Sequence, residues 1–134
     1  MKSPPCHLKI LLVENHEDTL KYLARYLEIQ GHEVSGVRDM VSAIKALSSS
    51  TFDVLISDIG LPDGDGWQLM RQLESKPFGI AMSGFGTHSD RQKSLAAGYK
   101  HHLTKPFLPE DLDALLAEAT AQFAEDPKPV RGTP

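Results

Sequence analysis

The sequence predicts an α/β protein built on a doubly wound, open parallel sheet. Short apolar runs alternate five times with segments of helical periodicity, and polar residues follow most of the apolar runs. Strands that alternate with helices at this spacing form βαβ units with right-handed crossovers, so we expect five parallel strands and five helices. The 134 residues suffice for one domain with one packed core.

The first strand is expected at Leu8–Val13, which is almost continuously apolar, as strands buried on both faces are. From Thr19 the period changes to that of an amphipathic helix. Its apolar face is formed, at the i, i+3, i+4 and i+7 spacing, by Leu20, Leu23, Ala24 and Leu27. Gly31 is the expected stop signal of this helix.

The other elements follow the same alternation. Strands are expected at Glu33–Val37, Phe52–Ser57, Gly79–Ser83 and Tyr99–Leu103. Helices are expected at Met40–Leu47, Gly66–Leu73, Ser89–Ala97 and Leu108–Phe123. We expect the domain to span residues 8–124 and residues 1–7 and 125–134 to be flexible termini, because three prolines after residue 125 prevent a continued helix.

Composition excludes several classes of protein. With 14 basic and 18 acidic residues and no basic cluster, the chain lacks the charge pattern of nucleic-acid-binding proteins. No apolar run reaches the ~18–20 residues that span a bilayer, and no signal peptide is evident, so no membrane association is expected. The single cysteine excludes an internal disulfide. We therefore expect a cytoplasmic protein.

Polar side chains with related chemistry follow four of the five expected strands. Because ligands bind at the carboxyl ends of strands in such sheets, these residues are expected to converge on one edge: Glu14, Asn15, Asp58, Ser83 and Lys105. Mg²⁺ takes one or two carboxylates and keeps waters or phosphate oxygens as its other ligands. A nearby hydroxyl and ammonium suit a phosphoryl group. The sequence therefore predicts a magnesium and phosphoryl site.

Four segments, in this order and each at an expected strand end, resemble the receiver domain of bacterial two-component response regulators. They are Ile10–Thr19, Asp53–Gly66, Met82–Gly84 and Leu103–Phe107. The resemblance covers nearly the whole chain and implies a flavodoxin-like (βα)5 fold with strand order 2-1-3-4-5. The sequences of segments 57–62 and 102–106 resemble those found in receivers that are attached to hybrid histidine kinases.

The resemblance also implies roles for individual residues. Asp58 matches the phosphoacceptor, with Ser83 bonding the phosphoryl oxygen and Lys105 pairing with the phosphoryl group. The implied Mg²⁺ ligands are Glu14, Asn15, Asp58 and the backbone carbonyl of Gly60. The implied switch residues are Ser83 and His102. A histidine kinase or histidine phosphotransfer protein is the implied phosphoryl donor.

Two positions depart from the family pattern. Asn15 stands where a second acidic residue is usual, which removes a unit charge beside the metal and weakens its binding. His102 stands where Tyr or Phe is usual, and its polar ring titrates near neutral pH. His102 either rotates as a switch or is a partly exposed strand histidine without a special role. Its neighbour His101 points to the opposite face of the strand, so the two cannot share one metal ion.

Two further motifs were weighed against these assignments. Residues 63–66 partly match a calcium loop, but Trp67 and Gln68 occupy positions that require a ligand and a glycine. This segment is therefore expected to be a turn with Asp65 as the N-cap of the next helix. Gly60 stands where an aspartyl phosphohydrolase needs a second aspartate.

The favoured function is a phosphoacceptor receiver that is not an enzyme on external substrates. It would signal to an unknown downstream protein through its fourth helix, fifth strand and fifth helix, as a monomer or a phosphorylation-dependent dimer. Two alternatives remain: a phosphorylation-independent pseudo-receiver, because of Asn15, and, less favoured, an aspartyl-phosphate phosphohydrolase.

Overall fold

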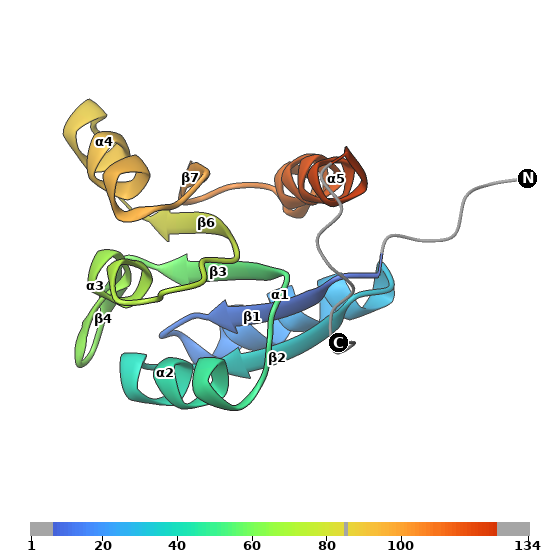
Figure 1. The fold of residues 1–134 in the computed structure, drawn as a ribbon, viewed down its shortest axis with the longest axis horizontal. Coiled ribbons are helices and arrows are strands. Elements are labelled where there is room, and N and C mark those ends of the chain that lie inside the picture. Colours follow the sequence, from blue (N-terminus) through green and yellow to red (C-terminus); the bar gives the residue numbers. More distant parts are fainter. Residues whose placement is uncertain (1–6, 85, 126–134) are drawn as a thin grey trace, which may run out of the picture.

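The computed structural model describes residues 7–84 and 86–125. Strands and helices alternate along the chain (Figure 1): β1 (Lys9–Val13), α1 (Glu17–Ile29), β2 (Glu33–Val37), α2 (Met40–Ser49), β3 (Val54–Asp58), β4 (Gly60–Leu61), β5 (Gly64–Asp65), α3 (Gly66–Arg71), β6 (Phe78–Ser83), α4 (His88–Ala97), β7 (His101–Thr104) and α5 (Pro109–Glu125). Five of these strands form a parallel sheet in the order β2-β1-β3-β6-β7. Numbered within that sheet, the order is 2-1-3-4-5, so the predicted fold is confirmed.

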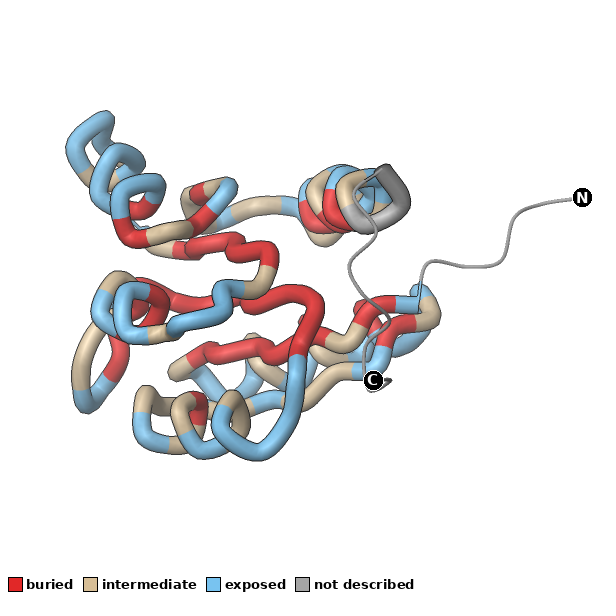
Figure 2. Tube along the Cα trace, in the orientation of Figure 1, coloured by how far each residue is buried: buried red, intermediate tan, exposed pale blue. Residues whose placement is uncertain are grey.

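The sheet separates two apolar clusters. Alternate residues of β1 face opposite sides: Ile10 and Leu12 pack with residues of α1 and α5, whereas Leu11 and Val13 pack with residues of α2, α3 and α4. All four side chains are completely buried. Burial is concentrated in the strands, while the helices expose their outer faces (Figure 2). This double coverage explains why the inner strands are continuous apolar runs.

The chain also forms a small antiparallel hairpin that the sequence did not predict. Strand β4 pairs with β5 through two residues on each side. Strands this short carry no readable periodicity, which is why the segment was interpreted only as a turn. At the tip of the hairpin, the Asp63 carboxylate accepts hydrogen bonds from the backbone N–H groups of Met40 (2.7 Å) and Val41 (3.0 Å). The hairpin thereby caps α2.

Local signals fix two helix ends, and the first of them, the N-cap at Asp65, is confirmed as predicted. The Asp65 carboxylate accepts a hydrogen bond of 2.7 Å from the Gln68 N–H, which makes Asp65 the N-cap of α3. Gly98 ends α4 with φ of 119°, a left-handed conformation that favours glycine. The predicted strand start at Tyr99 is wrong by two residues, because the Tyr99 side chain is buried below the strand end and its hydroxyl donates to the Gly66 carbonyl.

Gly66, the first residue of α3, lies directly against the end of β3. A Cβ atom at this position would lie 2.5 Å from the backbone oxygen of Asp58. The Gly66 N–H also donates to the Ile59 carbonyl at 2.8 Å. A residue without a side chain therefore allows α3 to begin where β3 ends.

Parts of the expected termini lie outside the described residues, namely residues 1–6 and 126–134. Of the remainder, His7 forms a hydrogen bond of 3.0 Å with the Gly31 carbonyl, and Glu125 ends α5. None of the helices among residues 7–84 and 86–125 combines the length and hydropathy needed to cross a bilayer.

Candidate phosphoryl and metal site

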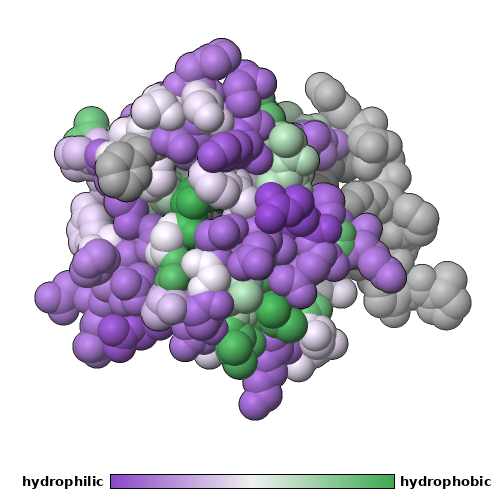
Figure 3. All heavy atoms as spheres, turned by 90° about the vertical axis from the view of Figure 1, so that its left-hand side faces the viewer, coloured by the Kyte–Doolittle hydropathy of each residue, from purple (hydrophilic) through white to green (hydrophobic). Residues whose placement is uncertain are grey.

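The carboxyl ends of the parallel strands form one edge of the molecule, which Figure 3 shows as a largely hydrophilic surface with a few hydrophobic residues between. A cavity of about 280 Å³ opens there. Its lining includes five of the residues singled out from the sequence: Asn15, Asp58, Gly60, Ser83 and Lys105. Glu14 lies beneath them and is completely buried. The structure thus brings the predicted strand-end residues together.

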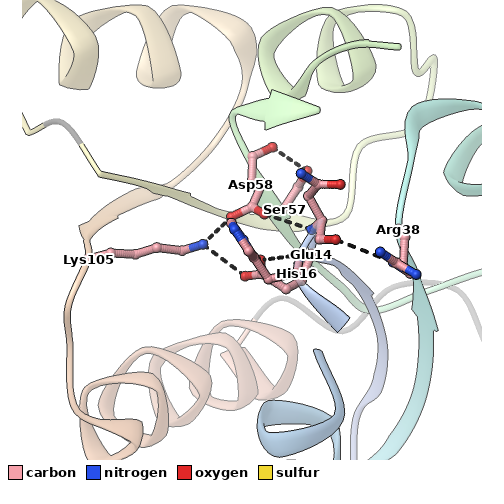
Figure 4. A network of polar contacts seen from close by, with 7 residues as sticks. Glu14, His16, Arg38, Ser57, Asp58 and Lys105 are labelled. Atoms are coloured by element: carbon pink, nitrogen blue, oxygen red, sulfur yellow. Dashed lines mark hydrogen bonds and ion pairs between the residues drawn. The ribbon is translucent and has the colours of Figure 1, made fainter. Parts of the chain in front are cut away.

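Lys105 bridges the two carboxylates of the site (Figure 4). Its Nζ atom lies 2.7 Å from Asp58 Oδ1 and 2.9 Å from Glu14 Oε1. The Lys105 side chain is 29% exposed, whereas the Glu14 and Asp58 side chains are 0% and 7% exposed. One cation therefore neutralises much of the charge of two nearly buried acids, which otherwise repel each other strongly in this medium.

Backbone amides of the β1–α1 loop hold the remaining carboxylate oxygens. The Asn15 N–H donates to Asp58 Oδ2 at 3.0 Å, and the His16 N–H donates to Glu14 Oε2 at 3.0 Å. Arg38, which follows β2, donates through Nε to the Asn15 carbonyl at 3.3 Å. Both acids are therefore fixed in place before any ligand arrives, because each is held from two sides.

The site shifts the pKa values of its three charged groups. Burial raises the pKa of Asp58, and the Glu14 carboxylate adds to the rise despite opposing hydrogen bonds from Lys105 and the Asn15 amide. Burial also raises the pKa of Glu14, but the His16 N–H and Lys105 together lower it below its usual value. Although burial lowers the pKa of Lys105, the two carboxylates raise it overall. The acids titrate as a coupled pair, and Asp58 is the one that retains a proton more readily.

The second predicted switch residue, His102, is buried rather than partly exposed, with 9% of its surface accessible. Its Nε2 atom lies 2.9 Å from the Ser83 hydroxyl, and its Nδ1 atom lies 2.8 Å from the Ser94 hydroxyl on α4. His101 points the other way and contacts Glu118 of α5 at 2.9 Å. The predicted opposite orientation of the two histidines is confirmed.

The donor set suits a magnesium ion. Glu14 and Asp58 supply two carboxylates, the half-buried Asn15 lines the same cavity, and Gly60 has open space where a side chain would stand. Mg²⁺ needs no more than one or two carboxylates when waters complete its shell. No group of three or more His, Cys, Asp or Glu side chains that could hold a metal ion is found in the described part of the chain.

Sequence reasoning located the strand-end residues but missed their connections. It did not predict that Lys105 bridges both carboxylates, nor that the amides of Asn15 and His16 hold the other oxygens. It also missed Ser94 entirely. The structure shows that the Ser94 hydroxyl is completely buried and therefore requires a hydrogen-bond partner, but the sequence of α4 gives no signal of this burial.

Comparison with known proteins assigns the chain to a family. Residues 10–117 match the response regulator receiver domain. The chain therefore belongs to the receiver domains of two-component response regulators, a regulatory family.

Three relatives illustrate how such domains are used. The chain is 30% identical over 124 residues to an uncharacterized protein of Leptolyngbya boryana, covering 89% of this chain and 95% of that protein. It is 36% identical over 112 residues to the two-component response regulator PhoP of Pseudomonas aeruginosa and 29% identical over 117 residues to the sensor protein EvgS of Escherichia coli. These matches cover 81% and 85% of this chain but only 50% of PhoP and 10% of EvgS.

Solved structures agree. A two-component response regulator from Clostridium difficile superposes with a TM-score of 0.82 at 25% identity, covering 86% of this chain and 97% of that one. A receiver domain protein from Methanospirillum hungatei gives a TM-score of 0.82 at 25% identity, with coverage of 88% and 97%.

Proposed function

We propose that the protein is a phosphoacceptor receiver in which Asp58 takes a phosphoryl group from a histidine kinase or histidine phosphotransfer protein. The observation that supports this most directly is the arrangement around Asp58. The residue Asp58 is 5% exposed. Its carboxylate is paired with the Lys105 ammonium at 2.7 Å, and it lines a cavity that Ser83 also lines. A carboxylate so placed is a nucleophile with positive charge ready beside it.

In the transfer step, an Asp58 oxygen forms a bond to phosphorus while the P–N bond to the donor histidine breaks and the imidazole leaves. The incoming phosphoryl oxygens carry negative charge into a site that already holds Glu14. Lys105 moves its ammonium toward those oxygens, and the Ser83 hydroxyl donates a hydrogen bond to one of them. The Asn15 N–H keeps the carboxylate oriented during attack, because it bonds Oδ2 at 3.0 Å.

Glu14, Asp58, the Asn15 side chain and the Gly60 carbonyl would hold Mg²⁺, which would offset the negative charge of the phosphoryl group when bound. The Lys105 ammonium contacts one oxygen of each carboxylate, so it would compete with Mg²⁺ for these two acids. Asn15 contributes no charge to the site. We therefore expect weak metal binding and slow phosphorylation.

We further propose that the output surface is formed by α4, β7 and α5, and that its partner is a downstream protein. Leu95 of α4 is 51% exposed and Leu108, just before α5, is 62% exposed, so this side offers apolar contacts. The protein would use this surface whether it signals as a monomer or as a phosphorylation-dependent dimer. A protein of this kind acts in the cytoplasm.

Incubation with acetyl phosphate and Mg²⁺, followed by intact-mass measurement, tests the proposal. We expect a gain of one phosphoryl group, with the P–O bond to acetate broken and acetate released. Asp58→Asn abolishes the gain. Asp53→Asn, at the other end of the same strand, is the matched control and keeps it. A gain that survives Asp58→Asn would contradict the proposal.

A second candidate is a phosphorylation-independent pseudo-receiver. Two observations favour it: the uncharged Asn15 in the pocket, and the Lys105 ammonium that pairs with both acids. If it is correct, wild type gains no phosphoryl group in the same assay, and a gain in Asn15→Asp would assign this loss to the missing charge at position 15. Continuous release of phosphate with turnover would instead indicate a phosphohydrolase.

A further inference from the structure

A chain of hydrogen bonds, buried at its two middle residues, connects Ser83 and Trp67, which both line the cavity. The Trp67 indole N–H donates to Ser94 Oγ at 2.9 Å, Ser94 Oγ lies 2.8 Å from His102 Nδ1, and His102 Nε2 lies 2.9 Å from Ser83 Oγ. Ser94 is completely buried and His102 is nearly so. Helices α3 and α4, which carry Trp67 and Ser94, cover the same face of the sheet (Figure 1).

The direction of this chain follows from counting protons. An indole N–H can only donate, so Ser94 Oγ accepts from Trp67. The Ser94 hydroxyl has one proton of its own, and among the described residues its hydrogen-bond partners are Trp67 and His102. A buried hydroxyl proton without an acceptor is costly, so this proton is donated to His102 Nδ1.

If Nδ1 accepts, the imidazole is neutral and carries its proton on Nε2. Both other forms of the ring, the Nδ1–H tautomer and the imidazolium, place a proton on Nδ1 and leave the Ser94 proton without that acceptor. His102 Nε2–H therefore donates to Ser83 Oγ. The Ser83 hydroxyl therefore accepts from His102 and does not donate its own proton to it.

We propose that Trp67, Ser94 and His102 form a hydrogen-bond relay of fixed direction, in which His102 is a positioning residue that orients the Ser83 hydroxyl as a donor to the phosphoryl group. This inference rests on the proposed function of Asp58. The relay makes Ser83 an acceptor on one side, so its proton is directed elsewhere, and the cavity that Ser83 shares with Asp58 and Lys105 is where a phosphoryl oxygen would accept it. A phenylalanine ring at position 102 could not do this.

The first test reads the tautomer directly and needs no phosphorylation. Long-range ¹H–¹⁵N correlation spectra of the histidine side chains are recorded at neutral pH for wild type and Ser94→Ala. We expect one Nε2–H tautomer of His102 in wild type and a substantial Nδ1–H population in Ser94→Ala, because the alanine cannot donate to Nδ1. An Nδ1–H tautomer or an imidazolium in wild type would overturn the relay.

The second test measures the rate of Asp58 phosphorylation by acetyl phosphate. Ser94→Ala and the near-isosteric His102→Phe are each expected to slow it about fivefold, the equivalent of one ordinary hydrogen bond. Lys93→Gln is the matched control and leaves the rate unchanged, because it removes the ammonium 5.2 Å from the Trp67 ring centroid but keeps the indole N–H.

The two tests separate the failure of the relay from the failure of the proposed function. If wild type gains no phosphoryl group, the proposed function fails, and the tautomer spectra still decide the direction of the relay. If wild type is phosphorylated and both Ser94→Ala and His102→Phe react at the wild-type rate, the relay does not position Ser83 and the inference is wrong.

Discussion

Strand β3 lies between two aspartates that are almost equally buried and have opposite surroundings. Asp53 precedes the strand and Asp58 ends it, and their exposed fractions are 7% and 5%. Asp53 Oδ2 accepts a hydrogen bond of 2.8 Å from the Lys9 N–H, and the backbone of Asp53 bonds to that of Lys9 and of Phe78. It therefore joins the amino ends of β1, β3 and β6.

Asp58 stands in a different electrostatic setting. It has a cation at 2.7 Å and a second buried acid that shares this cation. Its pKa is raised, chiefly by burial. The comparison teaches that burial of an aspartate is not by itself a sign of function. At the amino edge the carboxylate connects strands, whereas at the carboxyl edge it lies beside a shared cation and a second acid, which is the arrangement behind its proposed phosphoacceptor role.

The largest effect is expected from removing the shared cation. Lys105→Ala leaves two nearly buried carboxylates without their counter-ion, and we expect a loss of about 2–4 kcal/mol in the free energy of unfolding, slightly below the values for fully buried pairs. Added Mg²⁺ should restore more stability to Lys105→Ala than to wild type, because it no longer competes with the ammonium. Urea unfolding with and without Mg²⁺ measures both effects.

The exposed Lys100→Ala is the control for this experiment and should change little in either condition. Equal stabilisation of wild type and Lys105→Ala by Mg²⁺ would show that the ammonium and the metal do not compete for the carboxylates.

The two aspartates should differ in the sign of their contribution to stability. Asp53→Ala removes an acceptor from the Lys9 N–H and is expected to lower the free energy of unfolding by about 1–3 kcal/mol. Asp58→Asn is expected to raise it, because a raised pKa means that the fold disfavours the ionised acid at neutral pH. Chemical denaturation at pH 7 compares them, and a destabilised Asp58→Asn would contradict the assigned direction of the Asp58 pKa.

Restoring the missing charge at position 15 should sharpen the contrast between the two edges. Asn15→Asp is expected to increase Mg²⁺ affinity about tenfold. The reason is that the substitution adds one unit of negative charge beside a divalent ion, in the effective dielectric of a protein surface. Titration calorimetry, or the fluorescence of the single tryptophan, measures the affinity. Identical affinities in the two proteins would show that the Asn15 side chain is not a metal ligand.

The smallest effect concerns pH. The pKa of Glu14 is lowered from 4.5, so its ionised form stabilises the fold above that value, and this contribution is lost as the pH falls through the folded-state pKa. Glu14→Gln should therefore be less stable than wild type by about 1 kcal/mol at pH 7, and the gap should close in the acid range. The free energy of unfolding of both proteins, measured from pH 7 to pH 3, checks this. A difference between the two proteins that stays constant over this range would contradict the prediction.

The fold and the composition of the pocket could be predicted because they depend on patterns along the chain. Continuous apolar runs identified the inner strands, and parallel strands place their carboxyl ends together. The hairpin of β4 and β5 could not be predicted, since two residues on each side are too few for a period.

The connections within the site depend on side-chain conformation, which the sequence does not encode locally. Strand alternation correctly placed His101 and His102 on opposite faces. It could not show that His102 reaches Ser94, because α4 consists of small and polar residues and its inward face is hard to identify from periodicity. The double contact of Lys105 likewise depends on where a long, flexible side chain ends.

The close approach of Gly66 to Asp58 has a consequence for engineering and for natural variation. Because a methyl group at Gly66 would collide with the main chain of Asp58, the position of the proposed phosphoacceptor can be disturbed without touching any charged group. A library that varies only the polar residues of the pocket would overlook this position. Even Gly66→Ala, the smallest substitution, would require the end of β3 or the start of α3 to shift.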